Sequence, residues 1–311
     1  MRGARMRHVW SRVSGGVLAA LFSVVILAAV ASAVSGAEAA PEPAVASQAL
    51  GTLEPAVASQ ALGTLSANVY AQTSAEHRAC CYGIFAAATW RLQEALEDAE
   101  PVPARPAVVM DLDETVLDNS SFQAFLYRNG LVYTPELWER FEREGVHEVG
   151  LVAGAELFIR KAESLGVAVV YLSNRNETNA SRTVAALAHV GLDTTLIAQR
   201  LFLKPNAGSS DKSRRRDAAS ARYNVLMYLG DNLRDFSEVF APDRLPHSAT
   251  TDDYLRAMEA RSASVDDATC HWGVDWFVLP NPMYGEWEKL VPPNPADILR
   301  PSGMEVRTGG E

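Results

Sequence analysis

Short apolar runs alternate with amphipathic segments from residue 107 to residue 282. Four runs are nearly continuous in hydrophobicity and end in polar residues, as buried strands do: 107–111, 167–174, 225–232 and 276–282. Segments with apolar residues at helical spacing lie between the first three runs: 155–166, 180–191 and about 214–222. The alternation predicts an α/β fold, a doubly wound parallel sheet with helices on both faces.

An amphipathic segment precedes the first of these runs. Thr73 and Glu76 have the spacing of a capping box, and apolar residues then recur at helical intervals to about Ala99. Prolines between residues 101 and 106 end the pattern, because proline does not fit a helix interior. We therefore expect a helix from Thr73 to about Ala99.

The first 39 residues have the layout of a secretory signal peptide. Arginines precede an apolar segment, 17–34, which sites of small residues follow. An uncleaved membrane anchor is the alternative, because the apolar segment is near the lower length limit for spanning a bilayer. We expect an exported protein, periplasmic or secreted, with no stable membrane anchor after cleavage.

A tandem repeat follows the predicted signal peptide. Residues 42–53 and 54–65 both read EPAVASQALGTL. Two copies cannot form a solenoid, which needs at least three repeats to bury a core. We therefore predict a disordered spacer at 40–66, a folded domain at 67–300 and a flexible tail at 301–311.

Composition excludes some classes of protein. The 28 basic and 38 acidic residues give a net charge of −10, which argues against a protein that binds nucleic acid by neutralising phosphates. The three cysteines, Cys80, Cys81 and Cys270, are too few for a disulfide framework, and their spacing does not fit a zinc site. A single disulfide from Cys80 or Cys81 to Cys270 stays open.

Polar residues follow three of the predicted strands, where a parallel sheet binds its ligands. These residues are Asp111 and Asp113, then Ser173 and Asn174, then Asp231, Asn232 and Asp235. Converging carboxylates repel one another unless a cation lies between them. An all-oxygen set of ligands suits Mg²⁺, with calcium as the nearest rival. The run DLDETVLDN is no EF-hand, because it follows a strand and lacks the glycine at the sixth position.

The same residues resemble the four motifs of the haloacid dehalogenase superfamily. Those motifs are Asp111-x-Asp113-x-Thr115, Ser173, Lys212, and Gly230-Asp231-Asn232-x-x-Asp235. A narrower resemblance within this superfamily, over about residues 67–290, is to the class C bacterial acid phosphatases. Five stretches resemble signatures of that class: QTSAEHRACCY, MDLDETVLDNS, YLSNR, LGDNLRDF and LPNPMYGEWE. The lipid-attachment cysteine of the lipoprotein members is absent. The resemblance implies a sheet of the same type with a cap, and the short insert near 120–150 predicts that this cap is small and mostly helical.

The resemblance also implies roles for the acidic residues. Asp111 would attack phosphorus, and Asp113 would protonate the leaving oxygen and later deprotonate water. Mg²⁺ would be held by the carboxylates of Asp111 and Asp231 and the main-chain carbonyl of Asp113. Asp235 would orient a metal-bound water or Lys212. Glu114, between these acids, is expected to face away as a surface or helix-capping residue.

The remaining expected roles concern the substrate. Ser173 and the amide of Asn174 would hold the phosphoryl oxygens, and Lys212 would cancel charge between Asp111 and phosphate. Lys212 is preferred to Lys204 because SSDK opens a helix. Arg175 either binds phosphate or pairs with Asp235. Trp138 and Tyr284 either stack a base or aryl group or belong to the core. The arginines at 214–216 are expected to form a solvated helix face.

These inferences together predict an exported Mg²⁺-dependent acid phosphatase that acts on small phosphomonoesters. Aryl phosphates and nucleoside 5′-monophosphates are the expected substrates, the latter as a 5′-nucleotidase activity. The alternatives are a nucleotide- or ligand-binding protein without turnover and a phosphotransferase. No nucleic-acid polymer is expected as a partner, and the oligomeric state stays open.

Overall fold

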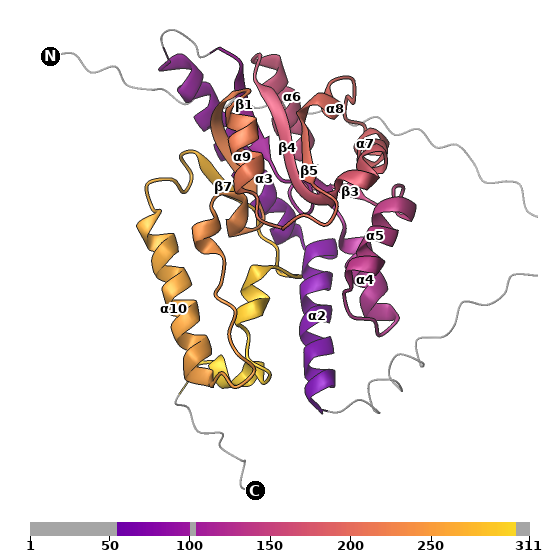
Figure 1. Ribbon diagram of the computed structural model, residues 1–311, viewed down its shortest axis with the longest axis vertical. Helices are drawn as coiled ribbons and strands as arrows, with labels where there is room; N and C mark the ends of the chain where they lie inside the picture. Colours follow the sequence, from indigo (N-terminus) through magenta and orange to yellow (C-terminus); the bar gives the residue numbers. More distant parts are fainter. Residues whose placement is uncertain (1–54, 100–103, 303–311) are drawn as a thin grey trace, which may run out of the picture. The chain divides into compact units, whose positions relative to one another are not determined.

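A parallel five-stranded sheet forms the core of the described part of the chain (Figure 1). The computed structural model describes residues 55–99 and 104–302. Its strands are β1 (Pro106–Met110), β4 (Ala168–Asn176), β5 (Leu201–Lys204), β6 (Asn224–Gly230) and β7 (Trp276–Val278). They pair in the order β5-β4-β1-β6-β7, and every neighbouring pair is parallel. The four predicted strands are present, and β5 joins them at one edge, next to β4.

Helices cover both faces of this sheet, as predicted. Alternate side chains of a strand point to opposite faces, so Val108 and Met110 of β1 belong to one core cluster and Ala107 and Val109 to another. The larger cluster includes residues of α3 (Ala75–Glu97), α6 (Ala155–Ser164) and α7 (Ala180–His189). The smaller includes Ala219 of α9 (Ser213–Ser220). A four-residue helix, α8 (Ile197–Arg200), leads into β5.

The segment between β1 and α6 forms the small, mostly helical cap. It contains α4 (Ser120–Arg128) and α5 (Pro135–Glu144). Strands β2 (Leu117–Asp118) and β3 (Gly150–Leu151) pair antiparallel where the segment leaves and re-enters the core. Thr134 caps α5 by accepting a hydrogen bond from the Leu137 amide at 3.2 Å.

The N-terminal helices differ from expectation in two places. The second repeat copy, part of the predicted spacer 40–66, is helical from its proline, because α2 spans Pro55–Thr73; proline suits the first helical turn. The predicted capping box at Thr73 is wrong by one residue. Ser74 has extended dihedrals and accepts from the His77 amide at 2.9 Å, whereas the Thr73 hydroxyl donates back to the Val69 carbonyl at 2.7 Å.

The C-terminal part contains α10 (Thr251–Asp267), and five short 3₁₀ helices lie between residue 177 and residue 298. These are η1 (Glu177–Asn179), η2 (Leu233–Asp235), η3 (Glu238–Phe240), η4 (Glu286–Leu290) and η5 (Pro295–Ile298). Cys80, Cys81 and Cys270 are all free thiols, and the first and third are exposed, so the possible disulfide is not formed. None of the helices in residues 55–99 and 104–302 is long and apolar enough to cross a membrane. The predicted signal peptide, 1–39, and the tail beyond residue 302 lie outside the described residues.

Phe158 of α6 tests the importance of the larger core cluster. Its ring is 1 % exposed and lies 5.8 Å from the ring of Phe85 on α3. Phe158→Ala leaves a cavity between sheet and helices, so we expect the free energy of unfolding to fall by about 3–5 kcal/mol in urea titrations. Leu157→Ala on the same helix, at a 65 % exposed position, is the control and should change it by less than about 1 kcal/mol. Equal losses in the two variants would contradict this account of the core.

Candidate active site

Adjacent strands bring three carboxylates to the C-terminal edge of the sheet. Asp111 directly follows β1, and its amide donates to the Leu229 carbonyl of β6 at 2.9 Å. Asp231 directly follows β6, and Asp235 ends η2 one short turn later. Oxygens from the three carboxylates lie within 4.8 Å of one another. The structure thus brings together three of the residues that the sequence predicted to share a cation.

Lys212 places one positive charge between two of these carboxylates. Its Nζ donates to Asp111 Oδ1 at 2.6 Å and to Asp235 Oδ1 at 2.6 Å. The third donor position is used by the Leu172 carbonyl at 3.1 Å. Lys212 is the residue before α9 and is buried, whereas Lys204 ends β5. The choice of Lys212 over Lys204 therefore agrees with the geometry.

The loop after β6 fixes Asp235 and Asp231 in different ways. The Asn232 amide donates to Asp235 Oδ2 at 2.9 Å and forms half of a capping box for η2. Gly230 makes room for this carboxylate, because a Cβ there would lie 2.2 Å from Asp235 Oδ2. Asp231 accepts from Thr115 Oγ1 at 3.3 Å and from Asn281 Nδ2 at 2.9 Å. Sequence reasoning missed Asn281, although it lies in the LPNPMYG stretch that carries part of the resemblance.

Burial and like charge disfavour ionisation of the clustered acids. Burial raises the pKa of Asp111 to about 7, with Asp235 and Asp113 adding to the effect and Lys212 opposing it. Burial, followed by the charges of Asp235 and Asp111, raises the pKa of Asp231 well above its ordinary value. Burial disfavours the charged Lys212 as well, but Asp111 and Asp235 outweigh it, and the pKa of the ammonium is raised. One lysine could not balance the three acids if all of them were ionised, and the raised pKa values of Asp111 and Asp231 reflect this.

Asp113 lies beside this cluster and has its own cation. Arg175 donates to Asp113 Oδ1 through Nε at 2.8 Å and contacts it through Nη2 at 2.7 Å. Asn119 Nδ2 donates to the same oxygen at 2.9 Å. The sequence left Asp235 open as an alternative partner of Arg175; this is wrong, because Lys212 contacts Asp235 and the guanidinium contacts Asp113. Phosphate binding by Arg175 stays a prediction.

The end of β4 carries the two residues predicted to hold phosphate. Ser173 is buried, and its Oγ lies 3.4 Å from Asp113 Oδ2, to which it donates. Asn174 has an exposed side chain whose Oδ1 accepts from Arg215 Nη2 at 2.7 Å. Arg215 also donates to the Ser173 carbonyl. The predicted solvated face at 214–216 is therefore wrong for Arg215, which is buried because its position on α9 points toward β4; Arg214 is exposed.

Glu114 is not the outward-facing acid that the sequence suggested. It is buried and has a φ of 58°, a left-handed conformation that is rare outside glycine. Its Oε1 accepts from the Asn119 amide at 3.0 Å, and its Oε2 has no hydrogen-bond partner among the described residues. Burial, then the charge of Asp113, raises the pKa of Glu114 well above its ordinary value. The tight turn after β1 directs this side chain inward.

The two aromatic residues proposed to contact the substrate are both half-buried. Trp138, on α5, lies with its ring 5.6 Å from the Arg175 guanidinium and 5.3 Å from the ring of Phe122. Tyr284 follows Asn281 by three residues. Stacking of a base or aryl group on either ring stays a prediction.

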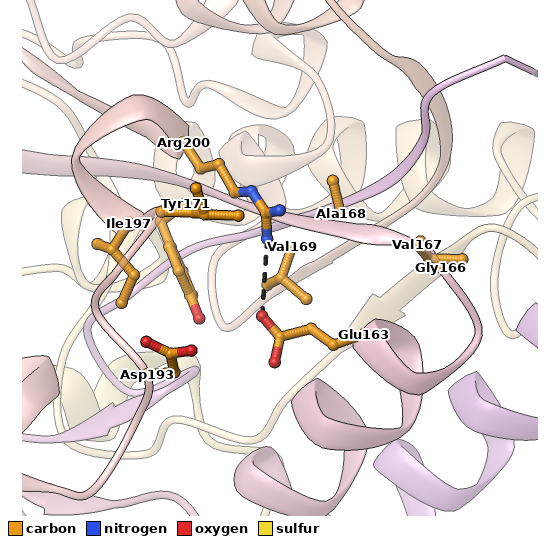
Figure 2. Close-up of a pocket in the computed structure, with 10 residues that line it drawn as sticks. Glu163, Gly166, Val167, Ala168, Val169, Tyr171, Asp193, Ile197 and Arg200 are labelled. Atoms are coloured by element: carbon orange, nitrogen blue, oxygen red, sulfur yellow. Dashed lines mark ion pairs between the residues drawn. The ribbon is translucent and has the colours of Figure 1, made fainter.

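A cavity of about 290 Å³ lies at the other end of β4, between α6, β4 and α8 (Figure 2). Glu163 and Arg200 form an ion pair of 3.6 Å at its wall, close to the ring of Tyr171. None of the residues that line it belongs to the carboxylate cluster. It is separate from the candidate active site, which is at the end where β4 reaches Ser173.

Comparison with known proteins identifies the family. Residues 37–287 match the model of the HAD superfamily, subfamily IIIB (acid phosphatase). The fold is similar to the class C acid phosphatase from Bacillus anthracis with tungstate bound, with 30 % sequence identity and a TM-score of 0.62. A second structure of the class C acid phosphatase from Bacillus anthracis has 30 % identity and a TM-score of 0.61, and each match covers 73 % of this chain and 87 % of the other. Since the family model matches well over half of the chain, the protein belongs to the acid phosphatases of HAD subfamily IIIB and is a phosphomonoesterase.

Proposed function

We propose that this phosphomonoesterase is exported and Mg²⁺-dependent, and that it hydrolyses small phosphomonoesters through a phosphorylated Asp111. Aryl phosphates and nucleoside 5′-monophosphates are the proposed substrates. The observation that carries the proposal is the contact of Asp111 with Lys212 at 2.6 Å, in a cluster with Asp231 and Asp235. Export rests on the layout of residues 1–39.

The residues present fit a hard divalent cation. Asp111, Asp231 and Asp235 offer only carboxylate oxygens, and like-charge repulsion with burial raises the pKa values of Asp111 and Asp231. A cation bound by such oxygens removes this repulsion, and Mg²⁺ accepts a set of few carboxylates completed by water and phosphate. Asp111 and Asp231 would hold it, with the Asp113 carbonyl and Asp235 near it. When bound, it would offset the carboxylate charge and polarise the phosphoryl group.

The proposed reaction has two steps that share Asp111 and Asp113. In the first, a carboxylate oxygen of Asp111 bonds to phosphorus, the phosphorus–ester oxygen bond breaks, and Asp113 protonates the departing oxygen. In the second, water attacks phosphorus and gives a proton to Asp113, and the bond to Asp111 breaks. One water is consumed, and an alcohol and inorganic phosphate are released.

The surrounding residues would hold the phosphoryl group during both steps. Ser173 and the main-chain amide of Asn174 lie at the end of β4, and Arg215 fixes their segment from α9. Lys212 contacts the Asp111 carboxylate, where its charge would reduce the repulsion between Asp111 and an anionic ester. Preorganised charges of this kind stabilise the transition state without reorganising during the reaction.

Replacing Asp111 tests the covalent step. We expect Asp111→Asn to lower kcat for p-nitrophenyl phosphate at least about 10³-fold, because the amide is a poor nucleophile. Acid-quenched protein should lose the phosphorylated species formed by the wild type. Asp118→Asn is the matched control, since Asp118 lies in the same motif but accepts a hydrogen bond from the Ser120 amide at 2.9 Å and does not contact Lys212 in the structure. Retained turnover in the Asp111 variant would exclude the covalent intermediate, and ligand binding by the wild type without turnover would favour a binding protein.

The raised pKa of Asp111 gives the metal-free protein a defined pH dependence. Its carboxyl has a folded pKa of about 7 against an ordinary 3.8, so its contribution to stability is complete below the ordinary value and is lost as the pH rises to about 7. We expect the Tm of protein treated with chelator to fall between pH 5 and 7.5. Addition of Mg²⁺ should raise Tm more at pH 7.5 than at pH 5.

Replacing Asp231 tests the origin of this pH dependence. Asp231→Asn should raise the Tm of the metal-free protein at pH 7.5 and reduce its response to Mg²⁺. Asp243→Asn, at an exposed position, should do neither. An equal response of the wild type to Mg²⁺ at both pH values would contradict the proposed repulsion.

A further inference from the structure

The two oxygens of Asp113 have different surroundings. Oδ1 is contacted by Arg175 Nε at 2.8 Å, by Arg175 Nη2 at 2.7 Å and by Asn119 Nδ2 at 2.9 Å. Oδ2 has a single contact, the Ser173 hydroxyl at 3.4 Å. A carboxylate oxygen with three donors has little capacity left for a proton, whereas the other oxygen keeps it.

Arg175 is in turn fixed by residues outside the four motifs. It is 1 % exposed, and its Nη2 donates to Asn119 Oδ1 at 3.0 Å. The Trp138 ring of cap helix α5 lies 5.6 Å from its guanidinium carbon. Glu142, one turn further along α5, is 2 % exposed and accepts from Asn179 Nδ2 at 2.7 Å. The guanidinium therefore contacts Asp113 on one side and lies beside the Trp138 ring of the cap on another.

Charge explains why these groups occur together. Burial disfavours a charged guanidinium, but Asp113 and, more weakly, Glu142 and Glu114 outweigh it and raise the pKa of Arg175. Glu142 is held through Asn179 at the start of α7, and its charge favours the ionised form of Arg175. Loss of Asp113 or of Glu142 would leave the buried charge of Arg175 less well compensated, which is costly.

We propose that Arg175 is a positioning residue that fixes Asp113 by Oδ1 and leaves Oδ2 as the oxygen that protonates the leaving group. This inference rests on the proposed function, in which Asp113 is the general acid. Trp138 and Glu142 act through Arg175, so the cap contributes to the geometry of proton transfer as well as covering the site. Two of the three guanidinium nitrogens are engaged with Asp113 and Asn119, which disfavours phosphate as the principal ligand of Arg175.

The consequence is a dependence on the leaving group. An alkoxide is a poor leaving group and needs its proton in the transition state, whereas p-nitrophenolate leaves readily without one. General acid catalysis is worth about 10²–10⁴-fold where it is needed. If Asp113 is no longer positioned, the hydrolysis of alkyl phosphates and nucleoside monophosphates should therefore slow much more than that of p-nitrophenyl phosphate. A residue that binds phosphate would affect all of these substrates alike, because they share the phosphoryl group.

The experiment compares Arg175→Gln, Arg175→Lys and Arg182→Gln in the full chain with saturating Mg²⁺. Arg182 is exposed on α7 and provides a matched control. The values of kcat and KM are measured for p-nitrophenyl phosphate, phenyl phosphate, glycerol 2-phosphate and adenosine 5′-monophosphate, with the inhibition constant of inorganic phosphate. We compare kcat/KM, which reports transfer to Asp111 and not the later hydrolysis.

For Arg175→Gln we expect kcat/KM to fall about 100-fold with glycerol 2-phosphate and less than about 5-fold with p-nitrophenyl phosphate. The inhibition constant of phosphate should change less than about 2-fold, and Arg175→Lys should recover part of the loss. An equal fall for all four substrates, or a large rise in the inhibition constant, would overturn the proposal and assign phosphate binding to Arg175. A wild type that hydrolyses none of the four substrates would instead refute the proposed function.

A second variant covers the case in which the Arg175 variants do not fold. Glu142→Gln keeps an acceptor for Asn179 but removes the charge that favours the ionised form of Arg175. We expect it to keep the wild-type circular dichroism spectrum. Its kcat/KM should fall about 10-fold with glycerol 2-phosphate and much less with p-nitrophenyl phosphate. Glu139→Gln, at a neighbouring position on α5, is its control. Unchanged kcat/KM ratios across the substrates in the folded Glu142 variant would show that the cap takes no part in positioning Asp113.

Discussion

Repulsion between carboxylates at the C-terminal edge of the sheet is the constraint on which the site depends. Parallel strands β1 and β6 are neighbours, so the residues that follow them, Asp111 and Asp231, are forced together. Asp235 joins them because Gly230 leaves space for its side chain. Lys212 contacts two of the three acids, so the charge of the cluster is not fully balanced, and the three carboxylates could hold a cation.

The sheet and its two apolar faces hold these groups in place. Because alternate residues of β1 enter different core clusters, the strand is fixed on both sides, and the residue that follows it has little freedom. Asn119 of the cap segment and Arg175 of β4 add a second support at Asp113. Asp111 and Asp113, the proposed nucleophile and proton donor, are two residues apart but contact different cations, Lys212 and Arg175.

The sequence was most informative where structure follows from short periodic patterns. The strands and the acids after them could be predicted, because a buried strand is a continuous apolar run and parallel strands end at one edge. The orientations and partners of Glu114, Arg175 and Arg215 could not be predicted. The inward direction of Glu114 depends on one left-handed dihedral, and that of Arg215 depends on where α9 starts, which a run of three arginines does not reveal. Arg175 reaches Asp113 because β4, which contains Arg175, and β1, which Asp113 follows, are neighbours in the sheet. Asn281 contacts Asp231 although fifty residues separate them in the sequence, and no local pattern predicts such a contact.

The first turn of α9 connects two parts of the site. Lys212 precedes the helix and contacts Asp111, while Arg215, three residues later, holds the segment of Ser173 and Asn174. Both side chains belong to one rigid element, so a small translation of α9 along the sheet would alter charge compensation and phosphoryl alignment together. Insertions in the loop from residue 205 to residue 211 would thus be poorly tolerated, although that loop is largely at the surface, because its length determines the register of the whole helix.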